Sequence, residues 1–460
     1  MVVLLKIIQV ILALSLLVLF HEFGHYSFAK LFKTRVEKFY LFFNPRISLL
    51  KFKRFGGKWH CKAFSSNDDP EWDAHPEHTE YGIGWLPFGG YCKIAGMIDE
   101  SMDTEAMKLP PQPYEFRTKK AWQRFFIMFG GVLFNFILAI ILYAAILGTW
   151  GEEFLRNEDA VYGVAVNDLS AEIGFRDGDR ILAFDGVPVE NFSNLQVDLV
   201  RSQAREATVL RDGDTLTIPI DPAYLPAMLN TPGMFDLAFP FVVKEVPAES
   251  PNAAAGLAAG DAFEGIDGKP MFIVQQIQKE LQQHRSESVT ASVRRGDTRL
   301  EIPLQVDTAG LVGVLLDTEL SKFFNVTTRE YSLLTALPAG ARKTWTTIKG
   351  YVQELGLIFS PKTQAYKSVG SFIAIGRIFP DTWDWYRFWS LCALLSIMLG
   401  VMNLLPIPAL DGGHILFLIF EMLTGRKPSD KFMVVAEWIG MVLLLMLMVL
   451  AFGNDIRSLF

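Results

Sequence analysis

Apolar residues are gathered into four long blocks along the chain instead of being spread evenly. The blocks cover residues 2–20, 125–147, about 389–407 and 433–452. Each is close to the ~20 residues that a helix needs to cross about 30 Å of hydrocarbon. The second block has no charged residue, and the fourth has Glu437 near its start. The pattern predicts a polytopic α-helical membrane protein with four transmembrane helices.

The first block could also be a cleaved signal peptide, because it is apolar and contains a single lysine, Lys6. However, no small-residue cleavage site follows it, and the sequence runs directly into His21 and Glu22. An uncleaved first span is therefore the preferred interpretation.

Charge outside the apolar blocks is divided by sign. Residues 26–124 carry 16 Lys and Arg against 12 Asp and Glu, whereas residues 151–330 carry 15 against 29. The positive-inside rule then predicts that residues 26–124 and 408–432 face the cytoplasm and that the acidic region lies outside. The overall net charge of −7 argues against a protein that binds nucleic acid through bulk positive charge. The three cysteines are too far apart in sequence for a disulfide framework.

The acidic region contains a tandem repeat. The segment Gly178–Gly186, which contains Gly-Asp-Arg-Ile and ends in Asp-Gly, recurs at Gly260–Gly268, and a second echo links residues 211–220 to 295–304. Short alternating apolar runs separated by Gly-Asp and Asp-Gly turns predict two small β-rich units. A short helix is expected to begin at Ser250, with a proline at its first position.

These two units resemble bacterial PDZ domains, which bind extended peptides by adding a strand to a sheet edge. The resemblance implies peptide C-termini as ligands. Two rigid spacers without a ligand remain the alternative, because a fold does not prove binding.

The end of the first block carries the sequence His21-Glu22-Phe-Gly-His25. On a helix, histidines four residues apart project from one face and can ligate one metal ion. Glu22 lies next to that face, where a carboxylate can take a proton from water. Ionisable groups beside an apolar span are costly to bury and indicate a functional site.

A catalytic zinc site normally has three protein ligands, and the third block offers the missing one. It closes with Asn403-Leu-Leu-Pro406-Ile-Pro408-Ala-Leu-Asp411, in which the prolines must break the helix. The predicted topology puts Asp411 and His25 at the same depth on the cytoplasmic side. A simple Asp-Gly turn is the alternative interpretation of Asp411.

The two motifs together resemble the site-2 protease family of intramembrane zinc metalloproteases. Four spans with two PDZ-like units between the second and third are similar to the RseP-type (regulator of sigma-E) branch of that family in Gram-negative bacteria. Gly131-Val-Leu-Phe-Asn135 and the segment 85–93 match further family motifs, while Cys92 and residues 60–79 depart from the family pattern.

The resemblance implies one Zn²⁺ ion held by His21, His25 and Asp411, with Glu22 as the catalytic base. Asn403 then belongs to the catalytic group, stabilising the developing oxyanion.

Substrate binding is implied for four further residues, Asn135, Gly89, Gly90 and Tyr91. Residues 35–65 are expected to form a β-hairpin around a turn at residues 44–45. The resemblance implies that this is a cytoplasmic-side re-entrant sheet that pairs with substrate. A plain core hairpin is the alternative.

The predicted domains are residues 1–150 with the first two spans, 151–235 and 236–320 as PDZ domains, 321–385 as linker helices, and 386–460 with the last two spans. The resemblance places the chain in a bacterial inner membrane, with the PDZ domains in the periplasm and the active site near the cytoplasm. Its expected substrates are single-span proteins, such as an anti-sigma factor already cut outside, and remnant signal peptides.

The remaining histidines are weaker candidate ligands. A second metal centre at His60, Cys61, His75 and His78 is disfavoured because acidic residues and a proline surround them, as in a solvated loop. His414 is expected to support Asp411 without ligating.

Two other function classes remain beside the protease. A catalytically inactive, membrane-tethered PDZ binding module would gain nothing from histidines buried beside a span. For a metal transporter, the only supporting features would be the four spans and a single set of metal ligands.

Overall fold

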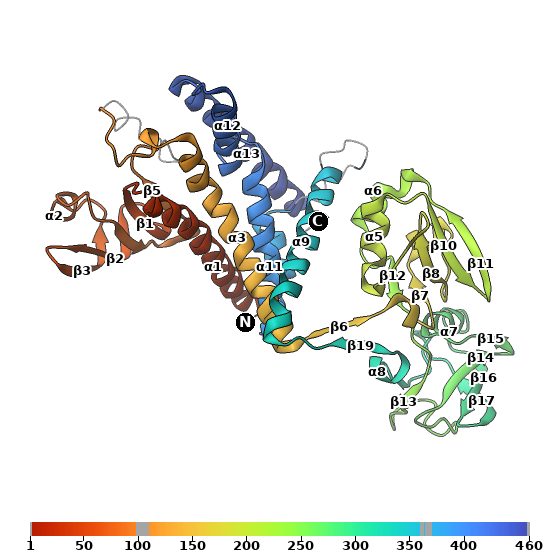
Figure 1. Cartoon of the computed structure of the whole chain (residues 1–460). Helices are drawn as coiled ribbons and strands as arrows, with labels where there is room; N and C mark the ends of the chain where they lie inside the picture. The colour runs from red at the N-terminus through yellow and green to blue at the C-terminus, as the bar shows by residue number, and fades with distance from the viewer. Residues whose placement is uncertain (1, 98–109, 359–362, 364–369, 458–460) are drawn as a thin grey trace. The chain divides into compact units, whose positions relative to one another are not determined.

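The structure is a computed structural model that describes residues 2–97, 110–358, 363 and 370–457. The chain divides into two compact units (Figure 1). The first unit takes in the described residues of 1–151, 330–356 and 369–460, and the second takes in those of 152–329 and 357–368.

Within the described residues, four helices are long and apolar enough to cross a membrane, which confirms the predicted spans. They are α1 (Val2–Leu31), α3 (Ala121–Trp150), α11 (Trp385–Leu404) and α13 (Asp430–Arg457). Apolar side chains surround these helices because lipid or a neighbouring helix covers every face. Since α1 continues past the apolar block to Leu31, the His-Glu-x-x-His segment is helical.

Helices α1 and α3 approach each other closely at two glycines. A Cβ on Gly24 would lie 2.2 Å from the Gly130 carbonyl oxygen, and a Cβ on Gly130 would lie 2.6 Å from the Gly24 carbonyl oxygen. Small residues allow this close contact between membrane helices. Helices α1, α3 and α11 therefore lie side by side in Figure 1.

A β-sheet follows α1 in the first unit. Its strands are β1 (Val36–Phe43), β2 (Ile47–Phe55), β3 (Lys58–Ser66), β4 (Glu80–Ile83) and β5 (Leu86–Ile94). Their order is β3-β2-β4-β1-β5, with β4 parallel to β1 and the other neighbours antiparallel. Strands β3 and β5 are therefore the edges.

The predicted hairpin over residues 35–65 is wrong in its pairing. Strand β4 lies between β1 and β2, so that Tyr81 pairs with Phe39 on one side and Phe52 on the other. Strand β2 instead forms a hairpin with β3 around Gly56, which has φ +58°. The expected hairpin does not form because β4, which comes later in the chain, pairs with both β1 and β2.

Residues 60–79 supply most of β3 and a segment that packs against the sheet. The Trp72 side chain is fully buried, and its carbonyl accepts a hydrogen bond from Lys53 Nζ at 2.7 Å. Lys51 is also fully buried and pairs with Asp69 at 3.2 Å. The segment therefore covers lysines whose burial would otherwise be unfavourable.

The remaining helices of the first unit are shorter or lie outside the candidate spans. They are α2 (Pro70–Asp73), α9 (Leu333–Ile358), which ends at the border of the unit, α10 (Phe372–Ile378) and α12 (Asp411–Thr424). Helix α12 begins with the candidate ligand Asp411, directly after the proline-containing loop.

The second unit contains two β-rich repeats, as the sequence pattern predicted. Their sheets have the orders β11-β10-β8-β9 and β17-β16-β14-β15, which correspond strand by strand. The elements of this unit are β6 (Glu152–Leu155), β7 (Val164–Val166), α4 (Asp168–Ile173), β8 (Arg180–Phe184), β9 (Val187–Pro188), α5 (Leu195–Ser202), β10 (Glu206–Arg211), β11 (Asp214–Pro219), α6 (Leu225–Asn230), β12 (Phe235–Leu237), β13 (Val243–Glu245), β14 (Ala262–Ile266), β15 (Lys269–Pro270), α7 (Val274–Leu281), β16 (Ser288–Arg295), β17 (Thr298–Gln305), β18 (Leu315–Leu316), α8 (Leu320–Phe323) and β19 (Val326–Arg329).

The Asp-Gly pairs form the same turn in both repeats. Asp185 and Gly186 have φ angles of 47° and 76°, and Asp267 and Gly268 have 49° and 77°. Positive φ at both central residues defines the two-residue hairpin turn for which Asp-Gly is favoured. Each turn joins a long strand to a short one, β8 to β9 and β14 to β15.

The predicted helix at Ser250 is wrong. Residues 250–256 form successive turns, with Ala253 N donating to the Ser250 carbonyl and Ala255 N to the Asn252 carbonyl. Asn252 is buried, and its side chain donates to the carbonyls of Gln305 and Val312. These tertiary hydrogen bonds replace the helical ones that the local sequence favours.

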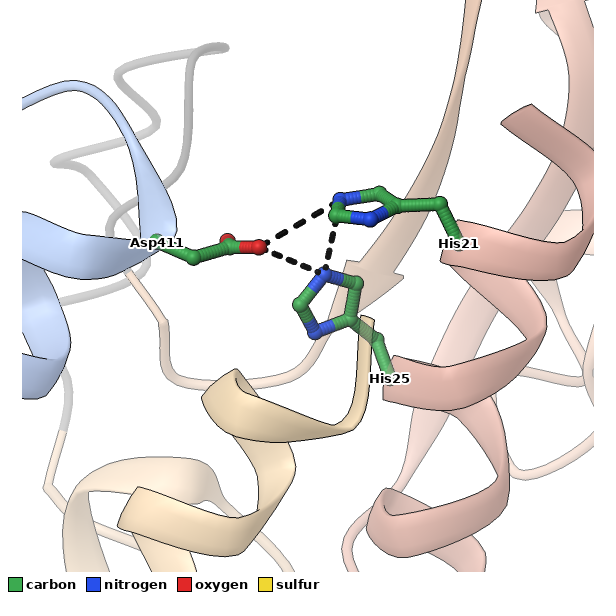
Figure 2. Close-up of side chains that lie close together, drawn as sticks. All are labelled: His21, His25 and Asp411. Carbon is green, nitrogen blue, oxygen red and sulfur yellow. Dashed lines mark hydrogen bonds and ion pairs between the residues drawn. The ribbon is translucent and has the colours of Figure 1, made fainter. Parts of the chain in front are cut away.

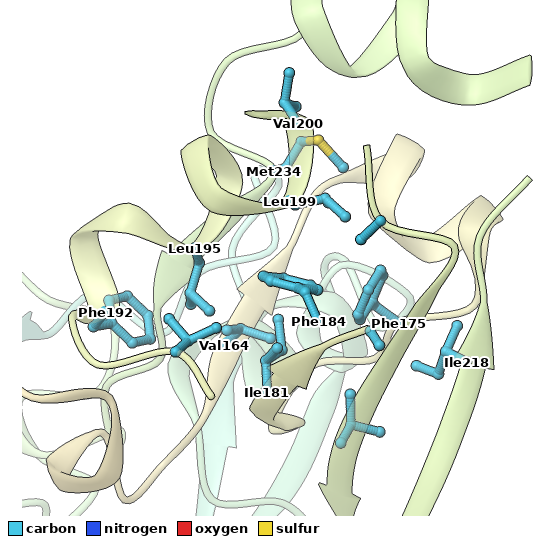
Figure 3. Packing of buried hydrophobic residues seen from close by; sticks show 14 of the residues in the cluster. Val164, Phe175, Ile181, Phe184, Phe192, Leu195, Leu199, Val200, Ile218 and Met234 are labelled. Atoms are coloured by element: carbon cyan, nitrogen blue, oxygen red, sulfur yellow. The ribbon is translucent and has the colours of Figure 1, made fainter. Parts of the chain in front are cut away.

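The first repeat has a continuous apolar core. Phe175 precedes β8, Ile181 and Phe184 lie in β8, and Leu195 begins α5; the four side chains pack together (Figure 3). Along β10, the buried residues alternate with more exposed ones, as expected for a strand with one covered face.

Candidate active site

Helix α1 presents His21 and His25 on one face, as their spacing predicts. Both side chains are buried against α3. A Cβ on Gly131 of α3 would lie 2.5 Å from His25 Nε2 and 2.6 Å from His21 Cε1. Glycine at this position therefore makes the space in which the two imidazoles lie.

Asp411 reaches the same point from the other end of the sequence. Its Oδ2 lies 3.3 Å from His21 Nε2 and 3.3 Å from His25 Nε2 (Figure 2). The two Nε2 atoms are themselves 3.3 Å apart. The three side chains come from α1 and α12 and point toward one common centre.

This arrangement fits a metal ion. Asp411 Oδ2 is buried and has no hydrogen-bond partner among the described residues. A buried oxygen without a donor is unfavourable unless a cation or a proton neutralises it. Two imidazoles and one carboxylate are a donor set of catalytic zinc, which keeps a further position open for water or substrate.

Contacts on the other ring nitrogens support this assignment. His25 Nδ1 lies 2.9 Å from the Ile127 carbonyl, which only accepts, so Nδ1 carries a proton, and in the neutral imidazole Nε2 keeps its lone pair. His21 Nδ1 lies 3.1 Å from Asn135 Nδ2, while Asn135 Oδ1 has no partner among the described residues. Rotating the amide exchanges these two atoms, and Asn135 Oδ1 then accepts from His21 Nδ1–H. Both Nε2 atoms are then available to a metal.

Glu22 lies beside the three converging side chains in a cavity of about 520 Å³. Besides the residues of α1, residues of β5, α12 and α13 line the cavity. Among the residues predicted to bind substrate, Gly90 and Tyr91 line it, whereas Gly89 and Asn135 are not among the described lining residues. Asn135 is fully buried at His21.

The two glycines and Tyr91 shape the edge strand. A Cβ on Gly90 would lie 2.6 Å from the Tyr40 carbonyl oxygen, and Gly89 has φ +148° with the Phe43 ring 2.6 Å from its Cβ position. Tyr91 stacks on Tyr40 at 5.4 Å. Burial and a hydrogen bond to a carboxylate raise the pKa of Tyr40 above its usual range, so this tyrosine stays neutral.

The last turn of α11 brings Asn403 to the site. Asn403 Nδ2 lies 3.3 Å from His21 Nε2, although Asn403 is not among the described residues that line the cavity. After Asn403 the chain turns tightly, and a Cβ on Gly412 would lie 2.1 Å from the Leu405 carbonyl oxygen. The glycine after Asp411 therefore lets α12 start against this loop.

Glu437 was not predicted to belong to the site, whereas His414 was expected to support Asp411 without ligating. Glu437 of α13 and His414 of α12 both line the cavity, and His414 Nε2 lies 3.7 Å from Glu437 Oε1. The sequence does contain a signal for Glu437, because an acidic residue that interrupts an apolar block indicates a functional site by default.

The other histidines lie elsewhere. His60 and His75 stack on the Phe55 ring, with centroid distances of 3.9 and 4.6 Å, and His78 is exposed beside Glu77. Among the described residues, three or more possible ligands converge at His21, His25 and Asp411 alone.

Comparison with known proteins gives a consistent result. The model of peptidase family M50 matches residues 9–65 and 71–447. A Xylella fastidiosa protein assigned as a zinc metalloprotease is 28% identical over 471 residues, covering 97% of each chain. Regulator of sigma-E protease RseP is 28% identical in Salmonella typhimurium and 27% identical in Escherichia coli, each over 473 residues and 98% of both chains. The matched regions contain all three converging side chains.

Proposed function

The chain belongs to peptidase family M50, the site-2 proteases, and is a zinc metalloprotease; we propose that it cleaves peptide bonds within the transmembrane segments of single-span proteins. The observation that carries this proposal is the convergence of His21, His25 and Asp411 between apolar helices. Such a site, lined by helices long enough to span a membrane, suits substrates that are themselves in the membrane.

His21, His25 and Asp411 would hold one zinc ion through two imidazole nitrogens and one carboxylate oxygen. When bound, zinc supplies a Lewis acid that polarises the scissile carbonyl and makes water a stronger nucleophile. The residues of the chain then have to orient the substrate and move the proton.

Glu22 is the proposed general base. Its carboxylate takes a proton from the attacking water and passes it to the nitrogen of the leaving amine as the C–N bond breaks. The position of Glu22 in the same cavity as the ligands supports this role.

Asn403 is proposed to donate an amide N–H to the oxyanion that develops on the scissile carbonyl. Its amide nitrogen is already beside His21 Nε2, next to the reacting centre. For Asn135, the burial and the contact with His21 favour orienting the imidazole over the substrate contact that the family resemblance implies.

The substrate is proposed to bind as an extended strand along β5. A helix hides its carbonyls in hydrogen bonds, so the peptide must unwind before the scissile bond is accessible. Strand β5 is an edge of its sheet, and Gly90 and Tyr91 of this strand line the cavity. Backbone pairing at this edge would hold the peptide beside Glu22.

The proposed location is a bacterial inner membrane, with the cavity near the cytoplasm and the repeats in the periplasm. The sign of charge on each side of the spans supports this orientation, since the basic segment 26–124 follows the first span. Substrates of this orientation include an anti-sigma factor already cut outside and remnant signal peptides.

The two repeats are proposed to be PDZ domains that exclude untrimmed substrates or bind new C-termini. Strands β6 and β19 pair at the two ends of the repeat region, so its ends lie close together. Replacing residues 160–310 with a short Gly-Ser linker should therefore leave the spans connected and make untrimmed substrates cleavable. Unchanged selectivity would contradict a filter.

The central experiment compares the wild type with Glu22→Gln on a tagged single-span substrate at equal expression. Loss of the proton carrier should lower the cleavage rate by about 10²–10⁴-fold while the protein keeps its zinc. Equal processing by both proteins would refute the protease mechanism. Trp438→Phe, at an exposed position of α13, is a matched control that should cleave normally.

A further inference from the structure

Helix α12 begins with Asp411, and so its position decides whether the carboxylate reaches the two histidines. The loop before it contains Ala409 with φ +76°. A residue with a Cβ is strained in this left-handed region and stays there only when its surroundings hold it. The contacts that fix this loop and α12 are therefore important for the metal site.

Helix α13 contacts this loop directly. A Cβ on Gly440 would lie 1.7 Å from the Pro408 carbonyl oxygen, so that the helix backbone lies against the loop one residue before Ala409. No side chain could be accommodated at that point without moving the loop or the helix.

Glu437 lies three residues before Gly440 and therefore on the same face of α13. Its side chain is 10% exposed within an apolar span, and its Oε1 lies 3.7 Å from Nε2 of His414. His414 is in turn three residues after Asp411, on the first turns of α12. A carboxylate in a membrane helix is costly unless it has a partner, and here the partner is on the ligand-bearing helix.

The far end of α12 has a second contact of this kind. Glu421 Oε1 accepts from Arg124 of α3 at 2.5 Å, and both side chains are largely buried. Arg124 Nε also donates to the Lys119 carbonyl at 3.1 Å, which fixes the guanidinium at the start of α3. Helix α3 is the same helix that carries Gly131 and Asn135 against the histidines.

We propose that Glu437 and Arg124 are positioning residues, which hold the two ends of α12 against α13 and α3 and thereby place Asp411 at the metal centre. This inference rests on the proposed ligand role of Asp411. Glu437 acts through His414, and Arg124 acts through Glu421; neither residue needs to touch substrate.

The test measures zinc retained by purified full-length protein against a competing chelator, together with kcat and KM for a single-span substrate. Glu437→Leu and Arg124→Gln should each lower zinc affinity by about 10- to 100-fold, the usual range for residues that orient ligands. The loss should be in kcat with KM unchanged, because the substrate edge β5 is not altered. Glu437→Gln, which keeps the shape of the side chain, should recover part of the affinity.

The charge-reversed pair gives the decisive control for the distal contact. Arg124→Glu and Glu421→Arg should each weaken zinc binding, and the double variant should restore much of it, since opposite charges again face each other. Trp438→Phe, on an exposed position beside Glu437, should bind zinc normally.

Normal zinc affinity in Glu437→Leu and Arg124→Gln would overturn the inference, and so would a double variant no better than the single ones. If instead Asp411 is not a zinc ligand, the proposed function fails, and Asp411→Asn would also retain zinc. This result distinguishes that failure from a failure of the positioning role alone. If the Leu variant does not fold, the Gln variant and the charge-reversed pair still decide.

Discussion

Two groups of histidines and carboxylates in the first unit contain similar donors but differ in geometry. In the ligand group, His21, His25 and Asp411, the donor atoms face one another at 3.3 Å and are buried. In the sheet group, His60, His75, His78 and Glu77, the rings stack on Phe55 or are exposed.

The difference shows that donor spacing in sequence is insufficient for a metal site. The His75 and His78 side chains are 40% and 46% exposed, and both can satisfy their nitrogens with Glu77 or water. In the ligand group, Gly131 of α3 leaves space for the two rings. Asp411 contributes a buried oxygen that has no hydrogen-bond donor among the described residues. Burial of incompletely satisfied donors is what favours a cation.

The largest expected effect is on the ligand group itself. Asp411→Asn keeps the shape of the side chain but removes its charge, and should lower zinc affinity more than about a hundredfold, above the range for supporting residues. Metal analysis after purification should find zinc in the wild type and little in the variant. Cleavage should be lost in parallel, and added zinc should restore it only partly. Full zinc content in Asp411→Asn would break the comparison.

A smaller loss of zinc affinity is expected when the space beside the imidazole rings of His21 and His25 is filled. Gly131→Ala introduces a methyl group 2.5 Å from His25 Nε2, and should weaken zinc binding by about tenfold or more because the imidazoles must move. Gly148→Ala is the matched control on the same helix, since its Cβ would lie 3.5 Å from the nearest atom, Cβ of Ala336. The control should keep zinc and become slightly more stable, as alanine favours helix. Equal zinc affinity in the two variants would show that the rings do not need this space.

Much of the fold and of the ligand group could be predicted, because both depend on local patterns. Apolar length predicts the spans, and the i, i+4 spacing predicts that His21 and His25 share a helix face. The proline-containing loop before Asp411 indicates irregular backbone beside a cavity. The two Asp-Gly turns follow from backbone preference alone.

The rest depends on contacts that no local pattern contains. Strand β4 enters the sheet between two strands that precede it by many residues, so the hairpin expected at residues 35–65 could not be corrected from its own sequence. The turns at Ser250 depend on hydrogen bonds to residues 305 and 312. The contact between His414 and Glu437 likewise joins two helices whose relative rotation is not encoded in either one.

The smallest effect on zinc binding is expected from substitutions in the sheet group. These substitutions test whether its histidines are dispensable for the metal site. The double variant His60→Ala, His75→Ala removes two rings that stack on Phe55. Each stacking contact contributes about 0.5–1.5 kcal/mol beyond its buried area, so the sheet should become modestly less stable. Zinc content and cleavage should stay within about twofold of wild type, as for most substitutions away from a site.

This double variant is informative because its two possible effects separate. Proteolysis of the folded protein should become faster near β2 and β3, which reports the loss of stacking. The protein should still contain one zinc ion per chain. A drop in zinc content without faster proteolysis would mean that the sheet histidines bind metal after all. Phe55→Leu, which removes the shared ring but leaves both imidazoles, distinguishes the two causes: it should reproduce the change in proteolysis if stacking is the role of His60 and His75, and should have no effect on zinc.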